Sequence, residues 1–409
     1  MLVKITILVL FSILDVKCNL VKKNIVFKKP NLHLFTVIKF HNDPCQAVSG
    51  LNGICFTSSE CEKKGGRASG DCAMGFGVCC IVEKSCGSQI NQNLTYFNFN
   101  SSISDSFCKI TICPLDSNVC RLRLDFEDFT LAGPLEDTAA DVADTAVKTL
   151  HSIIGECIED TFIVKAAEGP SPPAICGTNT GQHMYTSLRG GCATISVNLG
   201  ESTIERNLVV RTTQIPCTSE PLSDCLQYFT GTSGNIKSFN NGGTGTHLTN
   251  QKYTACIRRE RGYCSICWSS TSFQMSLQTA DNGDTGNKGM SEYDLDCGRT
   301  FIPDAATMPT YAGFGDYVEI PQGRCVGSTD DVESIDRYCG EVLACSPTTA
   351  GTATATPSSV CSSVYPFQIR VFTDSFEEIT KEDGVPGSTG VDRSPQTGFN
   401  LNYQQILCQ

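Results

Sequence analysis

The chain has 409 residues, and its 31 Lys and Arg against 43 Asp and Glu give a formal net charge of −12. An acidic chain that is poor in Lys and Arg is a weak candidate for nucleic-acid binding, because phosphate groups need a cationic surface. Its 25 cysteines are hard to explain in a reducing cytosol, and its 40% hydrophobic content argues against wholesale disorder. The length predicts two or three domains, and the composition predicts a secreted, disulfide-bonded, modular protein.

The N-terminus has the pattern of a signal peptide. A weakly basic start is followed by an apolar run from Ile5 to Leu14, which is too short to span a bilayer but fits a signal-peptide core. We expect cleavage after Cys18, which leaves 25 − 1 = 24 cysteines, an even number. Residues 19–44 are then either a pro-segment or linker, or a strand docked on the body. No later stretch approaches 18 uninterrupted apolar residues, so we expect no membrane anchor.

A cysteine-rich head follows. So short a segment cannot bury a self-sufficient core, and we expect disulfides to stabilise it. Its single cysteines end in the adjacent pair Cys79-Cys80 after Gly77-Val78, an order that resembles the clip domain of arthropod proteins. Six cysteines alone allow 15 pairings. The resemblance implies three of them: Cys45–Cys79, Cys55–Cys72 and Cys61–Cys80.

The rest of the chain reads as antiparallel strands. Apolar and polar residues alternate in several short segments separated by turns, which is typical of a sandwich or barrel. The expected strands include residues 120–129, 160–164, 193–199 and 207–212. Residues 86–217 and 225–408 each open with a cysteine and an aromatic pair, contain a central Cys-Gly, and end in a cysteine. One duplicated β-module explains this pattern more simply than one large domain.

Each half carries features that resemble a CUB domain. In the first half these include Cys86-Gly87, Leu122-Arg-Leu-Asp-Phe126 and Cys176-Gly177; in the second, Tyr338-Cys339-Gly340 and Gly398-Phe399-Asn-Leu-Asn-Tyr403. The whole layout resembles secreted arthropod CUB-domain proteins, which implies an all-β protein with two jelly-roll-like CUB β-sandwiches in tandem after a small clip-like module. The expected division is 1–18 (signal peptide), 19–44 (pro-segment or linker), 45–80 (clip-like module), 86–217 (first CUB-like domain) and 225–408 (second CUB-like domain, with a Thr/Pro-rich insertion at 346–359).

The CUB resemblance also implies disulfides. It gives Cys86–Cys108, Cys157–Cys176 and Cys225–Cys256. Cys113 and Cys120 flank a turn and are expected to bridge a hairpin, with Cys264–Cys267 in the equivalent place. Analogy between the halves suggests Cys192–Cys217 and Cys361–Cys408. The last four cysteines allow three pairings, of which we favour Cys297–Cys339 with Cys325–Cys345.

Calcium is a further expectation from the resemblance, because many CUB domains use one Glu and two Asp as oxygen ligands. In the first half Asp160 matches the first Asp position, but Asn198-Leu-Gly200 stands where the second belongs. In the second half Asp316 and Asp374 match both Asp positions, without a clearly placed Glu. We therefore expect no calcium in the first module, and treat Asp316 and Asp374 as candidate ligands in the second.

No catalytic constellation is evident. Clip domains often precede trypsin-like proteases, yet the sequence has no Gly-Asp-Ser-Gly-Gly run and no His-Cys pair. His183 is the least ordinary histidine, although a structural role is the simpler explanation. Cys264-Ser-Ile-Cys267 has redox spacing, but a structural disulfide is the better interpretation in so cysteine-rich a chain.

Two kinds of surface feature remain. Asn93 and Asn100 open N-glycosylation sequons, which apply to a chain that is exported. Arg258-Arg-Glu-Arg261 is a basic cluster that is either a processing site, an anion patch or a solvated face. We predict a secreted, non-catalytic recognition or adaptor protein without a bound cofactor, whose loops bind an extracellular protein or glycan. The alternatives are a clip-type regulator of a serine-protease cascade and a venom or salivary component.

Overall fold

A computed structural model of the chain describes most of the two halves and the head. The residues that it describes are 39–100, 106–136, 154–219, 224–241, 245–275, 301–302, 310–311, 316–326, 335–340, 342–343, 357–375 and 397–408. The predicted signal peptide, most of segment 19–44 and most of the insertion at 346–359 lie outside these ranges. Residues 41–409 form one compact unit, and only this unit is described below.

The head is a small disulfide-braced sheet with one short helix. Its elements are β1 (Pro44–Gln46), β2 (Asn52–Phe56), α1 (Ser58–Lys63), β3 (Gly66–Cys72) and β4 (Gly77–Lys84). Thr57 caps α1 by accepting a hydrogen bond from the Glu60 amide, while the Glu60 carboxylate accepts one from the Thr57 amide. At Gly66 a Cβ atom would lie 2.4 Å from the Cys80 sulfur, so glycine is needed where the chain passes the disulfide.

The head and the first sandwich share a sheet. Strand β4 pairs in parallel with β6 (Thr95–Asn100), so that Val82 lies beside Thr95. The boundary predicted at residue 80 therefore falls inside a strand. Tyr96 reinforces the connection, because it is buried in a small cluster with Ala47, Cys79 and Ile81, and its hydroxyl accepts a hydrogen bond from the Asn52 amide at 3.0 Å.

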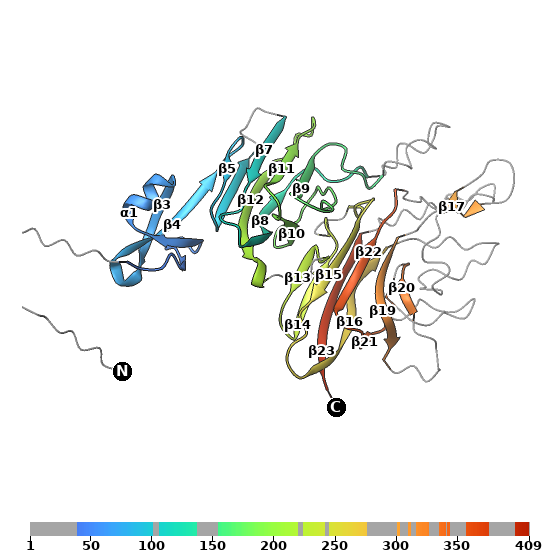
Figure 1. The fold of residues 1–409 in the computed structure, drawn as a ribbon. Coiled ribbons are helices and arrows are strands. Elements are labelled where there is room, and N and C mark those ends of the chain that lie inside the picture. Colours follow the sequence, from blue (N-terminus) through green and yellow to red (C-terminus); the bar gives the residue numbers. More distant parts are fainter. Residues whose placement is uncertain are drawn as a thin grey trace, which may run out of the picture. The chain divides into compact units, whose positions relative to one another are not determined.

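The first sandwich has two sheets (Figure 1). The larger runs in the order β1-β2-β4-β6-β12-β8-β10, with β3 beside β4, and the smaller in the order β5-β7-β11-β9. Side chains alternate along β12 between the interior and the outside, as predicted for half-buried strands. The rings of Phe126, Phe129 and Phe162 pack together in the core, with centroids 4.8 to 5.7 Å apart. The new strands are β5 (Gln89–Ile90), β7 (Phe107–Ile112), β8 (Val119–Thr130), β9 (Thr161–Lys165), β10 (His183–Ser187), β11 (Ala193–Asn198) and β12 (Asn207–Pro216).

The second sandwich is a single path of strands in the order β13-β15-β22-β19-β21-β16-β23-β14, with β20 beside β19. Strand β19 pairs with β22 near its start and with β21 at its end, so it connects the two groups of strands. Trp268 and Tyr403 lie on neighbouring strands, and both side chains are buried, with ring centroids 5.8 Å apart. The strands are β13 (Gln227–Phe229), β14 (Ser233–Lys237), β15 (Lys252–Ile257), β16 (Tyr263–Gln274), β19 (Tyr317–Cys325), β20 (Ile335–Tyr338), β21 (Val360–Ser362), β22 (Phe367–Phe372) and β23 (Gly398–Leu407); a separate pair is β17 (Phe301–Ile302) with β18 (Thr310–Tyr311). The predicted all-β fold with two sandwiches is confirmed.

Six disulfides have the pairing that the clip and CUB resemblances imply. They are Cys45–Cys79, Cys55–Cys72, Cys61–Cys80, Cys86–Cys108, Cys157–Cys176 and Cys225–Cys256. Cys325 and Cys339 are also disulfide-bonded. Cys297 and Cys345, which we paired with them, lie outside the described residues.

Four predicted pairs differ from the structure: Cys113–Cys120, Cys192–Cys217, Cys264–Cys267 and Cys361–Cys408. The observed pairs are Cys113–Cys192, Cys120–Cys217, Cys264–Cys408 and Cys267–Cys361. Each observed bond joins neighbouring antiparallel strands. Cys267 lies directly opposite Cys361 with their Cα atoms 3.9 Å apart, and Cys113 and Cys192 follow the Ile112–Ala193 pair at 4.1 Å. Cys264 and Cys267 lie three residues apart in β16, too far along one strand for a disulfide, and the other three predicted pairs joined cysteines that are not cross-strand neighbours.

Candidate functional site

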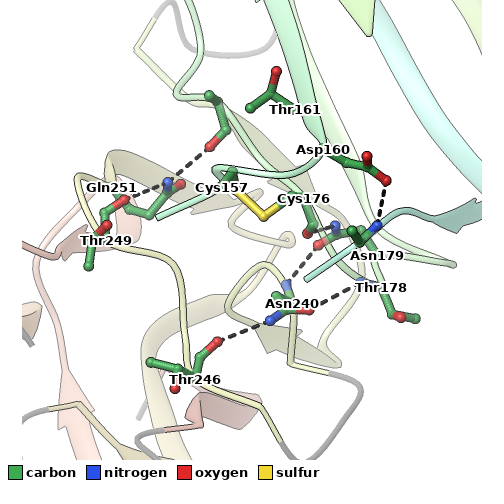
Figure 2. The surroundings of a disulfide bond; sticks show 12 residues. Cys157, Asp160, Thr161, Cys176, Thr178, Asn179, Asn240, Thr246, Thr249 and Gln251 are labelled. Carbon is green, nitrogen blue, oxygen red and sulfur yellow. Dashed lines mark hydrogen bonds between the residues drawn. A yellow bond between two sulfur atoms is a disulfide. The ribbon is translucent and has the colours of Figure 1, made fainter. Parts of the chain in front are cut away.

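A buried ion pair occupies the place where the first module resembles a calcium site. Asp160 precedes β9 beside the Cys157–Cys176 disulfide (Figure 2), and its side chain has no exposed surface. The Arg206 guanidinium binds both carboxylate oxygens, with Nε donating to Oδ2 at 2.7 Å and Nη2 donating to Oδ1 at 2.9 Å. The backbone amides of Ala132 and Gly200 donate to the same two oxygens at 2.7 and 3.0 Å.

These four donors determine the chemistry of Asp160. Burial raises the pKa of its carboxyl, but the hydrogen bonds from Arg206, Ala132 and Gly200 outweigh that effect and hold the pKa below its usual value. Both oxygens are already used, and the positive charge beside them belongs to the protein itself. The arrangement fits a permanent ion pair in which Arg206 supplies the positive charge.

The second module places its two candidate calcium ligands differently. Oδ1 of Asp316 accepts the Asp374 amide at 2.8 Å, and Oδ2 lies 3.4 Å from Nε2 of His247. Both Asp316 and His247 are buried. The His247 ring also lies 3.3 Å from the carbonyl oxygens of Leu248 and Met275. Asp316 is thus engaged by an amide and an imidazole, neither of which is the oxygen-rich setting that calcium prefers.

No group of three or more His, Cys, Asp or Glu side chains within the described residues is placed to hold a metal ion. The expectation that Asp316 and Asp374 bind calcium stays a prediction. The sequence had no signal for His247 as a partner of Asp316, because the two residues are far apart in the chain.

A polar junction joins the two modules (Figure 2). The Oδ1 atom of Asn240 accepts the Thr178 amide at 3.1 Å, the Asn240 amide donates to Oδ1 of Asn179 at 2.8 Å, and Nδ2 of Asn240 donates to the Thr246 carbonyl at 3.0 Å. Nearby, Nε2 of Gln251 donates to the carbonyl of Ala174. Asn179, Asn240 and Gln251 are buried, so these bonds are shielded from water.

His183 belongs to this junction. Its Nε2 accepts the Tyr228 amide at 3.0 Å, and its ring packs edge-on against Tyr185 and Phe229. Burial, together with the positive charge of Arg123, lowers the pKa of His183 to about 4. A neutral imidazole that already accepts an amide has a structural role, and this is the role that the sequence favoured.

The CxxC cysteines do not form a dithiol. Cys264 is bonded to Cys408 and Cys267 to Cys361, so each side chain is committed to a different strand. The sequon residue Asn93 also has a structural contact, since its Oδ1 accepts the amides of Leu94 and Gln214 at 2.9 and 2.7 Å. Asn100 is the last residue of β6, and its side chain lies outside the described part.

The basic cluster forms the turn between β15 and β16. We call residues 258–262, together with the adjacent Tyr365, the basic turn. Arg259 and Arg261 are exposed, and the Arg259 guanidinium carbon lies 4.9 Å from the centre of the Tyr365 ring. Glu260 faces Arg258, with Oε1 accepting from Nη2 at 2.8 Å. The sequence located the arginines but gave no sign that Tyr365 lies beside them.

The comparisons with known proteins bear on the second half. Residues 222–406 match the family model of the animal CUB domain, which spans the strands β13 to β23. The match does not reach the first sandwich, whose CUB resemblance stays a prediction. No curated protein matches the chain. No helix among the described residues is both long enough and apolar enough to cross a membrane.

Several solved structures are similar to the chain. The CUB1-EGF-CUB2 domains of rat MASP-1 are 13% identical, with 78% of this chain and 100% of that chain covered and a TM-score of 0.22. The corresponding domain of human MASP-1/3 is 14% identical, with 76% and 99% covered and a TM-score of 0.20. The full extracellular region of zebrafish Gpr126/Adgrg6 is 13% identical, with 79% and 37% covered and a TM-score of 0.23.

Proposed function

We propose that this animal CUB domain protein is a secreted, non-catalytic recognition or adaptor protein that binds extracellular proteins through its loops. The observation that carries the proposal is the CUB match over residues 222–406, on a sandwich whose strands are braced by disulfides. CUB domains mediate protein interactions, and a braced sandwich holds its loops in fixed positions, which lowers the entropy lost on binding.

Disulfide content supports an extracellular location. Ten disulfides have both cysteines among the described residues, and they occur in the head and in both sandwiches. Such bonds persist in oxidising compartments and are rare in the cytosol. The apolar N-terminal run adds a route of export.

The state of the reactive side chains supports a non-catalytic role. His183 is buried, neutral at ordinary pH and already bonded to an amide, so it is poorly placed to act as a general base. Cys264 and Cys267 are both oxidised into structural bonds. Affinity for a partner would then come from loop side chains and no chemical step is required.

The proposal is tested by using the purified full chain as bait in extracellular fluid from its native source. Chemical crosslinking followed by mass spectrometry identifies the retained proteins. We expect a reproducible protein partner with at least micromolar affinity. Addition of soluble, untagged chain should compete with the bait and reduce the amount of this partner that is retained. Retention of only abundant proteins, equally captured by a reduced and alkylated bait, would contradict the proposal.

One observation favours a second candidate, a regulator of an extracellular serine-protease cascade. The head has the three disulfides that the clip resemblance implies. This candidate predicts that the full chain changes the rate of zymogen activation in a reconstituted cascade. A chain in which the exposed head residue Met74 is replaced by Asp would lose that effect if the head makes the contact. An unchanged activation rate with wild-type protein would remove this candidate and leave the adaptor proposal standing.

A further inference from the structure

The basic turn is an isolated cationic feature on an acidic chain. The formal net charge of the protein is −12, yet three of the four residues from 258 to 261 in this turn are arginines. Arg258 is neutralised locally, because its guanidinium donates to Oε1 of Glu260 from both Nε and Nη2, at 3.0 and 2.8 Å. Arg259 and Arg261 are exposed and have no carboxylate partner among the described residues.

The turn is held in one conformation from inside the protein. Gln405 is 2% exposed and reaches the turn from β23. Its Oε1 accepts the Glu260 amide at 2.9 Å, and its Nε2 donates to the carbonyls of Arg258 and Gly231 at 2.8 and 2.9 Å. The carboxylate of Glu260 in turn accepts the Gly231 amide at 2.9 Å. The acidic residue of the cluster is therefore used for structure, while its basic neighbours point to solvent.

An aromatic side chain completes the surface. Tyr365 is 60% exposed. Its ring packs edge-on against the ring of the buried Phe367, with the two centroids 6.4 Å apart. The Arg259 guanidinium lies over the Tyr365 ring, which restricts the arginine but leaves N–H groups free to donate. Exposed tyrosine and arginine on a rigid support are the composition that interface hot spots favour.

We propose that the basic turn, with Arg259, Arg261 and Tyr365 in contact with the ligand, binds a short acidic segment of a partner protein. Guanidinium groups bind carboxylates through two parallel hydrogen bonds, and the tyrosine ring supplies apolar contact. A short segment fits better than a long polyanion, because two unpaired arginines on a chain of charge −12 cannot offset repulsion along an extended chain of negative charges. This inference rests on the proposed protein-binding function and gives it a surface.

The direct test measures binding of a fluorescent hexaglutamate peptide to the intact chain by anisotropy, at low and at physiological salt. Wild-type protein is expected to bind, more weakly as salt rises. The double variant R259E/R261E should lose about tenfold or more in affinity, and the milder R259Q/R261Q should also weaken binding. The milder variant keeps the test valid if charge reversal disturbs folding, and far-UV circular dichroism checks both.

The matched control is K109E/K165E, which changes the net charge equally. Lys109 on β7 and Lys165 on β9 are exposed on a different module. This control should bind hexaglutamate nearly as well as wild type. The proposal would be overturned if wild type did not bind hexaglutamate, or if R259E/R261E and K109E/K165E lost affinity equally. Binding of a heparin oligosaccharide in preference to hexaglutamate would also overturn it, by assigning the surface to sulfated glycans.

The bait experiment separates this inference from the proposed function. If wild type and R259E/R261E retain the same crosslinked proteins, the protein-binding function stands and the basic turn is not its surface. If neither bait retains a specific protein, the proposed function itself is wrong. Loss of a specific protein with R259E/R261E but not with K109E/K165E supports both.

Discussion

Arg206 shows how one side chain can take over a structural task that a metal ion could perform. Its guanidinium supplies a positive charge and two directed N–H groups to a carboxylate with no exposed surface. The segments around Ala132, Asp160 and Gly200 meet at this pair, although they are distant in the sequence. Because the charge is covalently part of the chain, the loops that meet here are ordered without a ligand.

We predict that Arg206→Gln destabilises the protein strongly, because it leaves the buried Asp160 carboxylate without its counter-charge. The expected loss is about 3 kcal/mol or more in the free energy of unfolding. The matched control is Arg370→Gln, which breaks the more exposed pair with Glu319 and should cost less than about 1 kcal/mol. Urea unfolding compares the two variants, and equal losses would show that the Arg206 pair contributes no more than a surface pair.

The same pair predicts the effect of calcium on hydrogen exchange. Exchange at the Ala132 and Gly200 amides in wild type should be the same in calcium and in a chelator, because Arg206 already occupies both oxygens of Asp160. In Arg206→Gln these amides should exchange faster. Calcium-dependent protection of these two amides in wild type would contradict the assignment.

His183 makes stability depend on pH. Its pKa is about 4 in the folded protein and 6.5 in a model peptide. As pH falls from about 6.5 towards 4, His183 becomes protonated in the unfolded chain but stays neutral in the folded chain. The free energy of unfolding therefore decreases over that window by up to about 3 kcal/mol. Below about pH 4 the contribution of His183 changes no further. His183→Gln keeps an acceptor for the Tyr228 amide but cannot titrate. Denaturant unfolding at pH 7 and pH 4.5 should therefore show a smaller loss in the variant, and an equal loss would contradict this role.

At the scale of strands, the disulfides follow neighbours in the sheet. In the first module Cys120 and Cys217 join β8 to the end of β12, and in the second Cys264 and Cys408 join β16 to the end of β23. Each bond ties the long central strand to the last strand, which pairs with it over most of its length. The two modules thus share this arrangement of one disulfide between two long paired strands.

Peptide mapping without reduction tests these pairs. Proteolysis of the native protein should release peptides joined through Cys264–Cys408 and Cys267–Cys361, and none joined through a Cys264–Cys267 loop. The reason is that residues opposite each other on paired strands have the Cα separation that a disulfide requires. Alkylation before reduction should leave the described cysteines unmodified. A Cys264–Cys267 loop, or alkylated cysteines in β16, would contradict the structure.

At the scale of the whole molecule, hydrogen bonds connect parts that the sequence presents as separate modules. The head continues into the first sandwich through β4 and β6, and the first module contacts the second through Asn179 and Asn240. The bonds at the junction are made by buried side chains, whose loss leaves unpaired polar groups.

Gly177 provides a test of the junction. A Cβ atom there would lie 1.9 Å from Oδ1 of Asn240, so Gly177→Ala should displace Asn240 and weaken the junction. The control is Gly169→Ala, since Gly169 has a similar positive φ of 80° but no atom within 4 Å of the added Cβ. Both variants lose about 1 kcal/mol from backbone strain, and Gly177→Ala should lose clearly more. Thermal unfolding and hydrogen exchange at Thr178 measure the difference, and equal effects would contradict the importance of this contact.

The sequence alone was sufficient for the fold class and, through a resemblance, for the disulfide pairing within the head. Alternation of apolar and polar residues predicted β8, β9, β11 and β12. Successive side chains of a strand point to opposite faces, so a strand with one buried face has apolar residues at every second position. The cysteine order of the head, read through its resemblance, also predicted the three bonds that the structure has.

Only the tertiary structure decided which strands lie side by side, and this determined several contacts between residues that are distant in the sequence. It paired Cys267 with Cys361, gave Asp160 its counter-charge in Arg206, placed His247 against Asp316, and brought Tyr365 to the basic turn. The physical reason is that a strand's own alternation specifies which side chains face inward but not which strand will be its neighbour. Ion pairs, disulfides and surfaces between strands follow from that second choice.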